Sequence, residues 1–239
     1  MTFSVDINGL PVEATYSEES INYIFIPLLH KLTLLQEVKG KRILIFLAAP
    51  PGAGKSTLAQ FLKHLSEKTE GVTPITVIGM DGFHRYQEYL LSHETVRNGE
   101  SIPMTKVKGA PETFDLELLR KRIEMVAAGD ECGWPEYDRT KHDPQENAIT
   151  VKGNIVLLEG NYLLLNDEGW CKLKEYADYT ISIKANPELL RERLIERKEM
   201  EMNEYSHEEA VAFVDYSDMV NVQTVLERSS QADLELDIF

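Results

Sequence analysis

The sequence predicts an α/β fold in which a parallel β-sheet is sandwiched between helices. Four short apolar runs with the composition of buried strands, at 43–47, 75–80, 155–160 and 179–184, alternate with longer segments of helical periodicity. The first run passes through a glycine-rich turn directly into a helical pattern. Strands that alternate with helices favour a parallel, doubly wound sheet, which binds its ligands at the carboxyl ends of the strands.

Composition limits the classes of function. The 239 residues, 43% of them hydrophobic, suit a single α/β domain with some elaboration. A formal net charge of −15 repels nucleic acid and anionic lipid, so we expect no nucleic-acid partner and no membrane partner. Cys132 and Cys171 have no metal-ligand spacing and predict reduced thiols. With no secretory leader pattern and no apolar run of membrane-spanning length, we expect a cytoplasmic protein.

The first 40 residues predict a separate structural unit. Alternating apolar residues on both sides of an Asn-Gly pair predict a hairpin over 2–16. Ser17 is placed to cap a following helix, whose apolar positions are 21, 24, 28, 32 and 35. We therefore expect 1–40 to pack on a core domain of 41–239, as parts of a single domain. A structural or dimer-forming role is the simplest interpretation, and it leaves a homodimer open.

The stretch from Ala49 to Thr57 predicts a phosphate-binding loop. Its glycines let backbone N–H groups close around phosphate oxygens, and the helix that follows adds its positive end. Lys55 would reach the β- and γ-phosphates, and the Ser56 hydroxyl would ligate Mg²⁺. Ala49 stands where the strict pattern begins with glycine, a costly change only if φ is positive there. The expected ATP-binding residues of this loop are Pro51, Gly52, Ala53, Gly54, Lys55, Ser56 and Thr57.

The middle of the chain predicts one helix between two long connections. Residues 86–113 are polar and punctuated by proline and glycine, which predicts an irregular loop with a functional role. Asp115 is expected to cap a helix that ends at Gly129. A second loop stretch is expected from 134 through 144. The apolar side of the helix is predicted to comprise Leu118, Leu119, Ile123 and Val126.

Two carboxylates lie at the ends of apolar strands. Asp81 comes after the strand at 75–80, and Glu159 comes directly after the four apolar residues 155–158. The carboxyl ends of parallel strands meet at one edge of the sheet, where the phosphate loop also lies. Asp81 could then accept a hydroxyl proton or coordinate metal, and Glu159 could hold Mg²⁺ directly or through water. Taken singly, either acid could instead be a helix cap or a solvated strand end.

A helix beginning at Asn186-Pro187 carries Arg191, Arg193 and Arg197. Arg193 and Arg197 are four residues apart and share one face. An arginine that closes over the phosphates stabilises the charge that develops during phosphoryl transfer. We therefore expect Arg193 and Arg197 to be catalytic and Arg191 to bind ATP. The interleaved glutamates also permit a salt-bridged, solvent-facing helix.

Several motifs together resemble the family of P-loop kinases that includes uridine kinases, phosphoribulokinases and bacterial pantothenate kinases. The pattern Pro-x-Tyr-Asp-x-x-x-His at 135–142 resembles the acceptor loop of uridine kinases. Residues 80–84 look like the Asp-Gly-Phe segment of pantothenate kinases. The segment 108–115 is similar to one in fructokinase-like and uncharacterised members, and 158–162 to the acidic strand end that they share. The resemblance covers about 42–230.

This resemblance implies an ATP- and Mg²⁺-dependent kinase that phosphorylates an alcohol group of a small metabolite. Asp81 would be the base, Glu159 an Mg²⁺ partner, and the arginine helix part of a lid. Arg139 departs from the uridine kinase pattern, which tends to be aromatic or apolar there, and the segment after Asp81 departs from it too. Both departures favour a sugar, polyol or pantothenate-like acceptor over a nucleoside. The residues expected to bind the acceptor are Phe83, His84, Tyr137, Arg139 and His142.

Two other functions use the same phosphate loop. A GTPase switch or metallochaperone would need a base-recognition element of the form Asn/Thr-Lys-x-Asp directly after a strand, and no such element follows any of the predicted strands; the pattern occurs only at 140–143, in the second expected loop. A regulatory nucleotide-binding protein without small-molecule turnover would need no acceptor base. Asp81 and Glu159 therefore favour a kinase over both alternatives.

Overall fold

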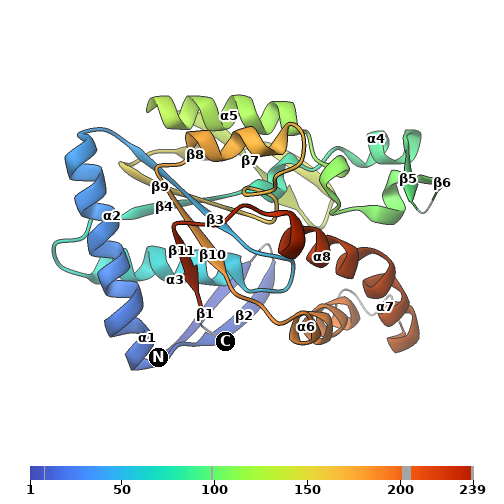
Figure 1. Cartoon of the computed structure of the whole chain (residues 1–239), viewed down its shortest axis with the longest axis horizontal. Coiled ribbons are helices and arrows are strands. Elements are labelled where there is room, and N and C mark those ends of the chain that lie inside the picture. The colour runs from blue at the N-terminus through green and yellow to red at the C-terminus, as the bar shows by residue number, and fades with distance from the viewer. Residues whose placement is uncertain (8, 98, 201–205, 238–239) are drawn as a thin grey trace.

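A five-stranded parallel sheet forms the centre of the computed structural model, which describes all residues except 8, 98, 201–205 and 238–239 (Figure 1). Every neighbouring pair of strands in it is parallel, in the order β11-β10-β3-β9-β4. The strand of this sheet that comes first in the chain, β3, therefore lies in its middle, between strands that come later. The strands are β3 (Ile43–Ala48), β4 (Ile75–Gly79), β9 (Ile155–Gly160), β10 (Tyr179–Ile183) and β11 (Leu234–Leu236).

Helices cover both faces of the sheet. They must, because the side chains of β3 point alternately to the two faces and all of them are buried. Ile43, Ile45 and Leu47 join one hydrophobic cluster, and the intervening residues join another. The first face is covered by α2 (Ile26–Lys39), α3 (Lys55–Lys68) and α6 (Pro187–Met200), and the second by α5 (Leu116–Ala128) and the 3₁₀ helix at Trp170–Tyr176. The remaining helices are α1 (Glu18–Ser20), α4 (Gln87–Ser92), α7 (His207–Phe213) and α8 (Met219–Arg228).

The N-terminal unit forms as predicted and packs on α3. Its hairpin pairs β1 (Thr2–Ile7) with β2 (Leu10–Thr15). Phe3 and Tyr16 of the hairpin contact the ring of Phe61 with centroid separations of 5.3 and 4.2 Å. The Ser17 hydroxyl accepts from the backbone N–H of Ser20, which is the predicted cap. Asn8 of the predicted turn lies outside the described residues.

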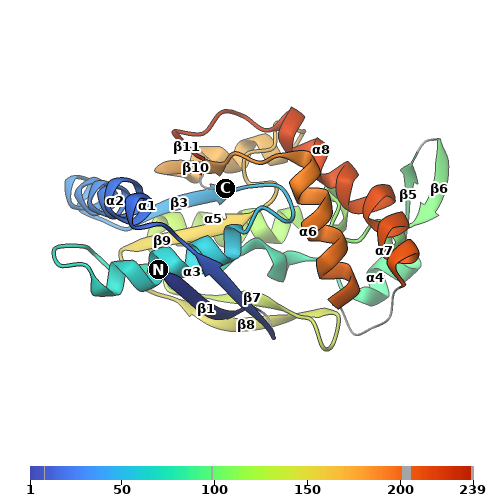
Figure 2. The ribbon, with the colours of Figure 1, turned by 90° about the horizontal axis from the view of Figure 1, so that it is seen from below.

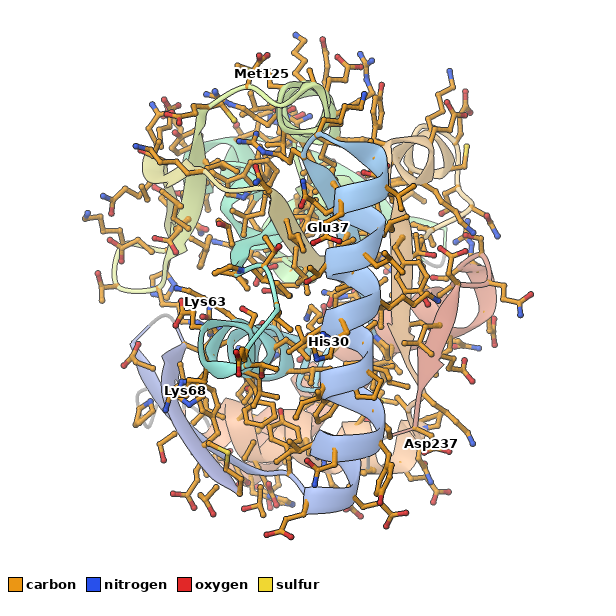
Figure 3. All side chains as sticks on the ribbon, turned by 90° about the vertical axis from the view of Figure 1, so that its left-hand side faces the viewer. His30, Glu37, Lys63, Lys68, Met125 and Asp237 are labelled. Carbon is orange, nitrogen blue, oxygen red and sulfur yellow. The ribbon has the colours of Figure 1, made fainter. Side chains whose placement is uncertain are left out.

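The helix that follows the hairpin reaches Gly40 along one end of the molecule. It includes a π-helical turn at Ile21–Phe25 between α1 and α2. Figure 3 shows α2 across this end, with His30 and Glu37 on it and α3 beside it with Lys63 and Lys68. Leu28, Leu29 and Leu32 of α2 are buried in the same cluster as β3, so this unit shares the core of the sheet.

The two predicted loops contain regular structure. Residues 86–113 hold α4, a hairpin of β5 (Glu94–Arg97) and β6 (Glu100–Pro103), and short 3₁₀ turns at Met104–Val107 and Pro111–Thr113. Residues 132–151 form a second hairpin of β7 (Cys132–Asp138) and β8 (Asp143–Val151), so the expected irregular stretch there was wrong. A register shift between Trp134 and Glu136 breaks the alternation that would have revealed the first strand.

The expected α5 forms with Asp115 as its N-cap and Gly129 as its left-handed C-cap. Its apolar side was predicted one residue too wide, because Leu118 is 38% exposed whereas Leu119, Ile123 and Val126 are buried. The carboxylate of Asp115 accepts a hydrogen bond from the backbone N–H of Leu118, in the first turn of the helix.

The chain closes with a strand that the pattern did not predict. Three residues of β11 pair with β10, and the Asp233 carboxylate accepts from both the N–H and the hydroxyl of Thr180, at 2.8 and 2.7 Å. A capping box formed by Ser206 and Glu209 begins α7, which continues through a π-helical turn at Val214–Asp218 into α8. In the described part of the chain, no helix is long and apolar enough to cross a membrane.

Candidate active site

The phosphate-binding loop joins the central strand β3 to α3, which begins at Lys55. Gly52 and Gly54 have φ values of +81° and +74°, a backbone region that residues with a Cβ rarely adopt. Ala49 is not among the residues with positive φ, so its replacement of the usual glycine introduces no strain there. The central position of β3 puts this loop where strand order reverses, the place where open α/β sheets bind ligands.

Glu159 lies beside the phosphate loop because β9 pairs with β3. The residue is opposite Leu47 in the ladder and is 9% exposed. Its Oε1 accepts from the Ser56 hydroxyl at 2.9 Å. Burial raises the pKa of the Glu159 carboxyl, and the Lys55 ammonium and the Ser56 hydrogen bond oppose that rise. The two oxygen-bearing side chains predicted to hold metal are therefore in direct contact.

This pair fits what Mg²⁺ requires. The ion is bound at kinase sites through one or two side-chain oxygens, with nucleotide phosphates and water completing the shell. The described residues hold no cluster of three or more His, Cys, Asp and Glu side chains, so no all-protein cage is formed among them. Ser56 and Glu159 would hold the ion, which would neutralise charge on the phosphates.

Asp81 lies in a 3₁₀ turn, Met80–Phe83, that follows the edge strand β4. Burial acts to raise the pKa of its carboxyl, but nearby positive charges outweigh burial and the net pKa is lowered. Asp81 is thus held in the ionised form that a base needs. The groups that lower the pKa are His84, Lys55, Arg139 and Arg197.

The turn that carries Asp81 packs tightly against β7. A Cβ added to Gly82 would lie 2.0 Å from the carbonyl oxygen of Pro135, closer than real Cβ atoms approach. The indole N–H of Trp134 donates to the carbonyl of Gly79 at 2.7 Å, which fixes the same strand to the end of β4. The position of Asp81 therefore depends on a contact between segments more than 50 residues apart.

A cavity of about 350 Å³ opens beside these groups. This volume is at the lower end of the range for small-molecule sites, and suits a compact metabolite. Residues from α3, the end of β4, β9, the β7–β8 hairpin and the N-terminal hairpin form its walls. They are Asp6, Ile7, Ser56, Gln60, Val77, Ile78, Gly79, Asp81, Gly82, Pro135, Glu136, Tyr137, Ile149 and Glu159.

Three of the five predicted acceptor residues surround Asp81. The Nδ1 of His84 lies 2.8 Å from the Asp81 carbonyl, an acceptor, so Nδ1 carries the proton and Nε2 accepts in the neutral ring. Burial lowers the pKa of His84, and the Asp81 carboxylate opposes that fall. Its ring lies 5.1 Å from that of Tyr137, which lines the cavity. Arg139 is close enough to act on both Asp81 and His84.

The other two lie elsewhere. Phe83 is 1% exposed and packs edge-on against Trp134 with centroids 4.8 Å apart, so it belongs to the core and its predicted role in acceptor binding is not supported. His142 is exposed in the turn between β7 and β8, with φ at +56°, and its carbonyl accepts from Lys108. The structure therefore does not bring His142 to the cavity wall.

The arginine helix α6 packs on the phosphate loop. A Cβ on Gly52 would lie 3.2 Å from Cγ of Leu194, which shows how closely the two segments approach. Arg193 and Arg197 share the face of Leu194 and Leu190 through spacings of three and four. Arg197 is near enough to lower the pKa of Asp81.

Arg191 points to another neighbour. Its guanidinium forms a two-bond ion pair with Asp215, at 2.6 and 2.9 Å. The residue is neither in the cavity wall nor among the charges that act on Asp81. Its predicted contact with ATP stays a prediction, and in this structure the guanidinium is held by Asp215.

Sequence analysis missed the contribution of the N-terminal hairpin to this site. Asp6 and Ile7 line the cavity together with Ser56 and Asp81. An alternating strand ending in a turn indicates a hairpin, but nothing in it indicates which surface its tip will meet. Gln60, one turn beyond Ser56 on α3, was the one missed residue with a local signal, because positions four apart share a helix face.

Comparison with known proteins gives this arrangement a family. A model described as an AAA domain matches residues 45–213. The uncharacterized protein YggC of Escherichia coli (strain K12) is 41% identical over 239 residues, covering all of this chain and 96% of that protein. A provisionally named uridine kinase of Schizosaccharomyces pombe is 31% identical over 203 residues, covering 82% of this chain and 83% of that one.

Solved structures agree with the fold. A provisionally named fructose transport system kinase from Silicibacter sp. TM1040 aligns with a TM-score of 0.72 and 29% identity, over 86% of this chain and 98% of that one. YFH7 of Saccharomyces cerevisiae aligns with a TM-score of 0.73 at 17% identity, over 90% and 98% of the two chains, which supports the fold alone. Residues 45–213 thus match an AAA domain. The chain belongs to the family of P-loop kinases whose members include proteins named uridine kinase and pantothenate kinase.

Proposed function

We propose that the protein is an ATP- and Mg²⁺-dependent phosphotransferase that phosphorylates an alcohol group of a small metabolite. The observation that carries this proposal is the cavity in which Asp81 and the Ser56–Glu159 pair face the same space. A protein that only bound nucleotide would need the phosphate loop but no ionised carboxylate beside an acceptor-sized cavity. The kinase names of its relatives are consistent with this chemistry.

The chain's own residues supply the steps of transfer. Backbone N–H groups of the loop and Lys55 hold the phosphates of ATP. Asp81 takes the proton of the acceptor hydroxyl as its oxygen attacks the γ-phosphorus. The bond from that phosphorus to the ADP oxygen breaks, and ADP leaves with the electron pair. Mg²⁺ at Ser56 and Glu159 would offset charge on the phosphates, and Arg197 and Arg193 would stabilise the transferring group.

The direct test is release of ADP from Mg-ATP across a panel of acceptors, with mass spectrometry of the product. The panel holds sugars, polyols, pantothenate, glycerate and nucleosides, and Lys55→Ala serves as the inactive reference. We expect one acceptor class to give ADP and its phosphorylated product together, in equal amounts. Tight ATP binding with no product across the panel would instead favour the regulatory alternative.

A further inference from the structure

The tip of the N-terminal hairpin is part of the cavity that contains Asp81. Asp6 and Ile7, the last two residues of β1, line the same space as Ser56, Asp81 and Tyr137. Figure 2 shows the hairpin on the α3 side of the sheet, where β1 runs below that helix. The hairpin precedes the matched AAA domain, which begins at residue 45. The cavity is therefore completed by a segment outside that domain.

The hairpin is fixed in this position by contacts along its whole length. At its base, the terminal ammonium of Met1 donates to the carbonyl of Tyr16 at 2.6 Å. In the middle, Phe3 packs on both Phe61 and His64 of α3, with centroids 5.3 Å away in each case. At the tip, the Asp6 carboxylate accepts from the N–H of Gly9 at 2.7 Å. Because α3 begins at the end of the phosphate loop, these contacts connect the hairpin to the loop through one helix.

The walls of the cavity carry an excess of negative charge. The described residues that line it include Asp6, Asp81, Glu136 and Glu159, and include no Lys, Arg or His. Two of these acids have partners, since Glu159 accepts a hydrogen bond from Ser56 and positively charged groups outside the lining act on Asp81. Asp6 and Glu136 form no ion pair among the described residues, and both are exposed. Their charge acts on whatever occupies the cavity.

We propose that the N-terminal hairpin is the outer wall of the acceptor site, and that Asp6 together with Glu136 selects acceptors without negative charge. This inference rests on the proposed kinase function. A carboxylate or phosphate on the acceptor would be repelled by two unpaired acids in a partly enclosed space of lowered dielectric. A neutral polyol or an amino alcohol meets no such repulsion, and its hydroxyls can donate to the same oxygens. Ile7 supplies the apolar part of the wall and limits acceptor size.

The charge test compares acceptors that differ only in an acid group, such as glycerol with glycerate, glucitol with gluconate, and panthenol with pantothenate. We expect wild type to show a higher kcat/KM for the neutral member of the active pair. The double variant Asp6→Asn, Glu136→Gln should raise kcat/KM for the anionic member at least tenfold and leave the KM for ATP unchanged. Asparagine keeps an oxygen for the Gly9 N–H, so the turn is preserved. Glu13→Gln removes an exposed charge from the same hairpin as the matched control.

The shape test compares Ile7→Ala with Val5→Ala, a change two residues earlier on the same face of β1. Ile7→Ala should change the acceptor KM severalfold without changing the KM for ATP, whereas Val5→Ala should change neither. A wild type that prefers the anionic partner, or a double variant with an unchanged preference, would overturn the inference.

Failure of the proposed function has a different signature. It would appear as no phosphorylated product from any pair while ATP still binds. Binding of the same pairs, measured by calorimetry with a non-hydrolysable ATP analogue, then decides the inference by itself. The inference that the hairpin forms the outer wall is supported if the neutral member of a pair binds, and if it binds more weakly to Ile7→Trp than to Val5→Trp. Binding that the two variants leave equal, or binding of neither member, would refute it.

Discussion

The nucleotide side and the acceptor side of this cavity are built in different ways. The nucleotide side comes from one continuous stretch, from the end of β3 through the loop into α3. The acceptor side combines a 3₁₀ turn after β4, a hairpin some 50 residues later and the tip of the N-terminal hairpin. Phosphate recognition uses backbone groups that a short sequence can arrange by itself. Acceptor recognition depends on side chains that only tertiary packing brings together.

This difference explains why the sequence could indicate the nucleotide but not the acceptor. Glycines with positive φ and a lysine at the helix start have one common chemical use, so the loop indicates a nucleotide. The acceptor walls are made of ordinary residues whose role is set by their neighbours. Relatives can therefore keep the nucleotide side and diverge in the acceptor side, and experiments should separate the two.

The largest effect is expected on the nucleotide side. Lys55→Ala should lower kcat by about 10²–10³-fold or more, because a preorganised cation at the phosphates is lost. It should also weaken ATP binding, which a change on the acceptor side would not do. Steady-state kinetics and ATP titration measure both. Lys68→Ala, an exposed lysine at the far end of the same helix, should change neither.

The next largest effect is expected from a substitution that disrupts the acceptor side of the cavity and leaves the nucleotide side intact. Gly82→Ala would put a Cβ 2.0 Å from the Pro135 carbonyl oxygen, so the Asp81 turn and β7 must separate. We expect turnover to be lost, stability to fall by about 1–3 kcal/mol, and ATP affinity to persist. Urea unfolding and ATP titration measure these. Gly129→Ala, strained by its positive φ but remote from the cavity, should lose stability and keep its kinetics.

The arginine helix separates a residue near the site from one that is not. Arg197→Ala should lower kcat by about 10²-fold, since its charge acts on the Asp81 region and on the transferring phosphoryl group. Arg191→Ala should leave kcat within severalfold of wild type, because that guanidinium is paired with Asp215. Equal losses in the two variants, measured at saturating ATP, would contradict the assignment.

The smallest expected effect is on stability, and it concerns neither the nucleotide side nor the acceptor side of the cavity. Hydrogen bonds from Thr180 lower the pKa of Asp233. A carboxyl with a lowered folded pKa stabilises the fold above its unfolded pKa of about 3.9, and that stability is lost as pH falls through the folded value. Asp233→Ala should therefore cost about 1 kcal/mol at pH 7, and the difference from wild type should narrow below about pH 4.

Urea unfolding at several pH values measures this effect, with Glu235→Ala on the same strand as the control. Kinetics should be unchanged in both variants, because β11 is at the far edge of the sheet from β4. A difference that widened on acidification would show that the Asp233 carboxylate does not stabilise β11.

The sequence patterns predicted most of the central sheet and the helix caps at Ser17 and Asp115. Both caps form as expected, because each satisfies backbone groups within three residues. The family and the chemistry at Asp81 and Glu159 also follow from local rules, since parallel strands bring their carboxyl ends to one edge. The kinase family was confirmed by the comparisons, and the roles of individual site residues stay predictions.

The errors have a common physical origin in long-range packing. The β7–β8 hairpin was missed because a register shift interrupts its alternation, and β11 because three residues form too short a pattern. Phe83 follows Asp81 in the motif, yet its side chain turns into the core against Trp134. Arg191 lies on the same helix as Arg197 but pairs with Asp215, and its role in binding ATP stays a prediction. None of these outcomes can be obtained without knowing which surfaces meet.

The central claim is that Asp81 activates an acceptor and takes no part in holding ATP. The measurement that tests it most directly is turnover of the identified acceptor by Asp81→Asn, together with the affinity for Mg-ATP. Asp138→Asn, in the neighbouring hairpin but outside the cavity wall, is the matched control. We predict that Asp81→Asn abolishes phosphorylated product and binds Mg-ATP nearly as tightly as wild type. Full phosphoryl transfer by Asp81→Asn would contradict the mechanism.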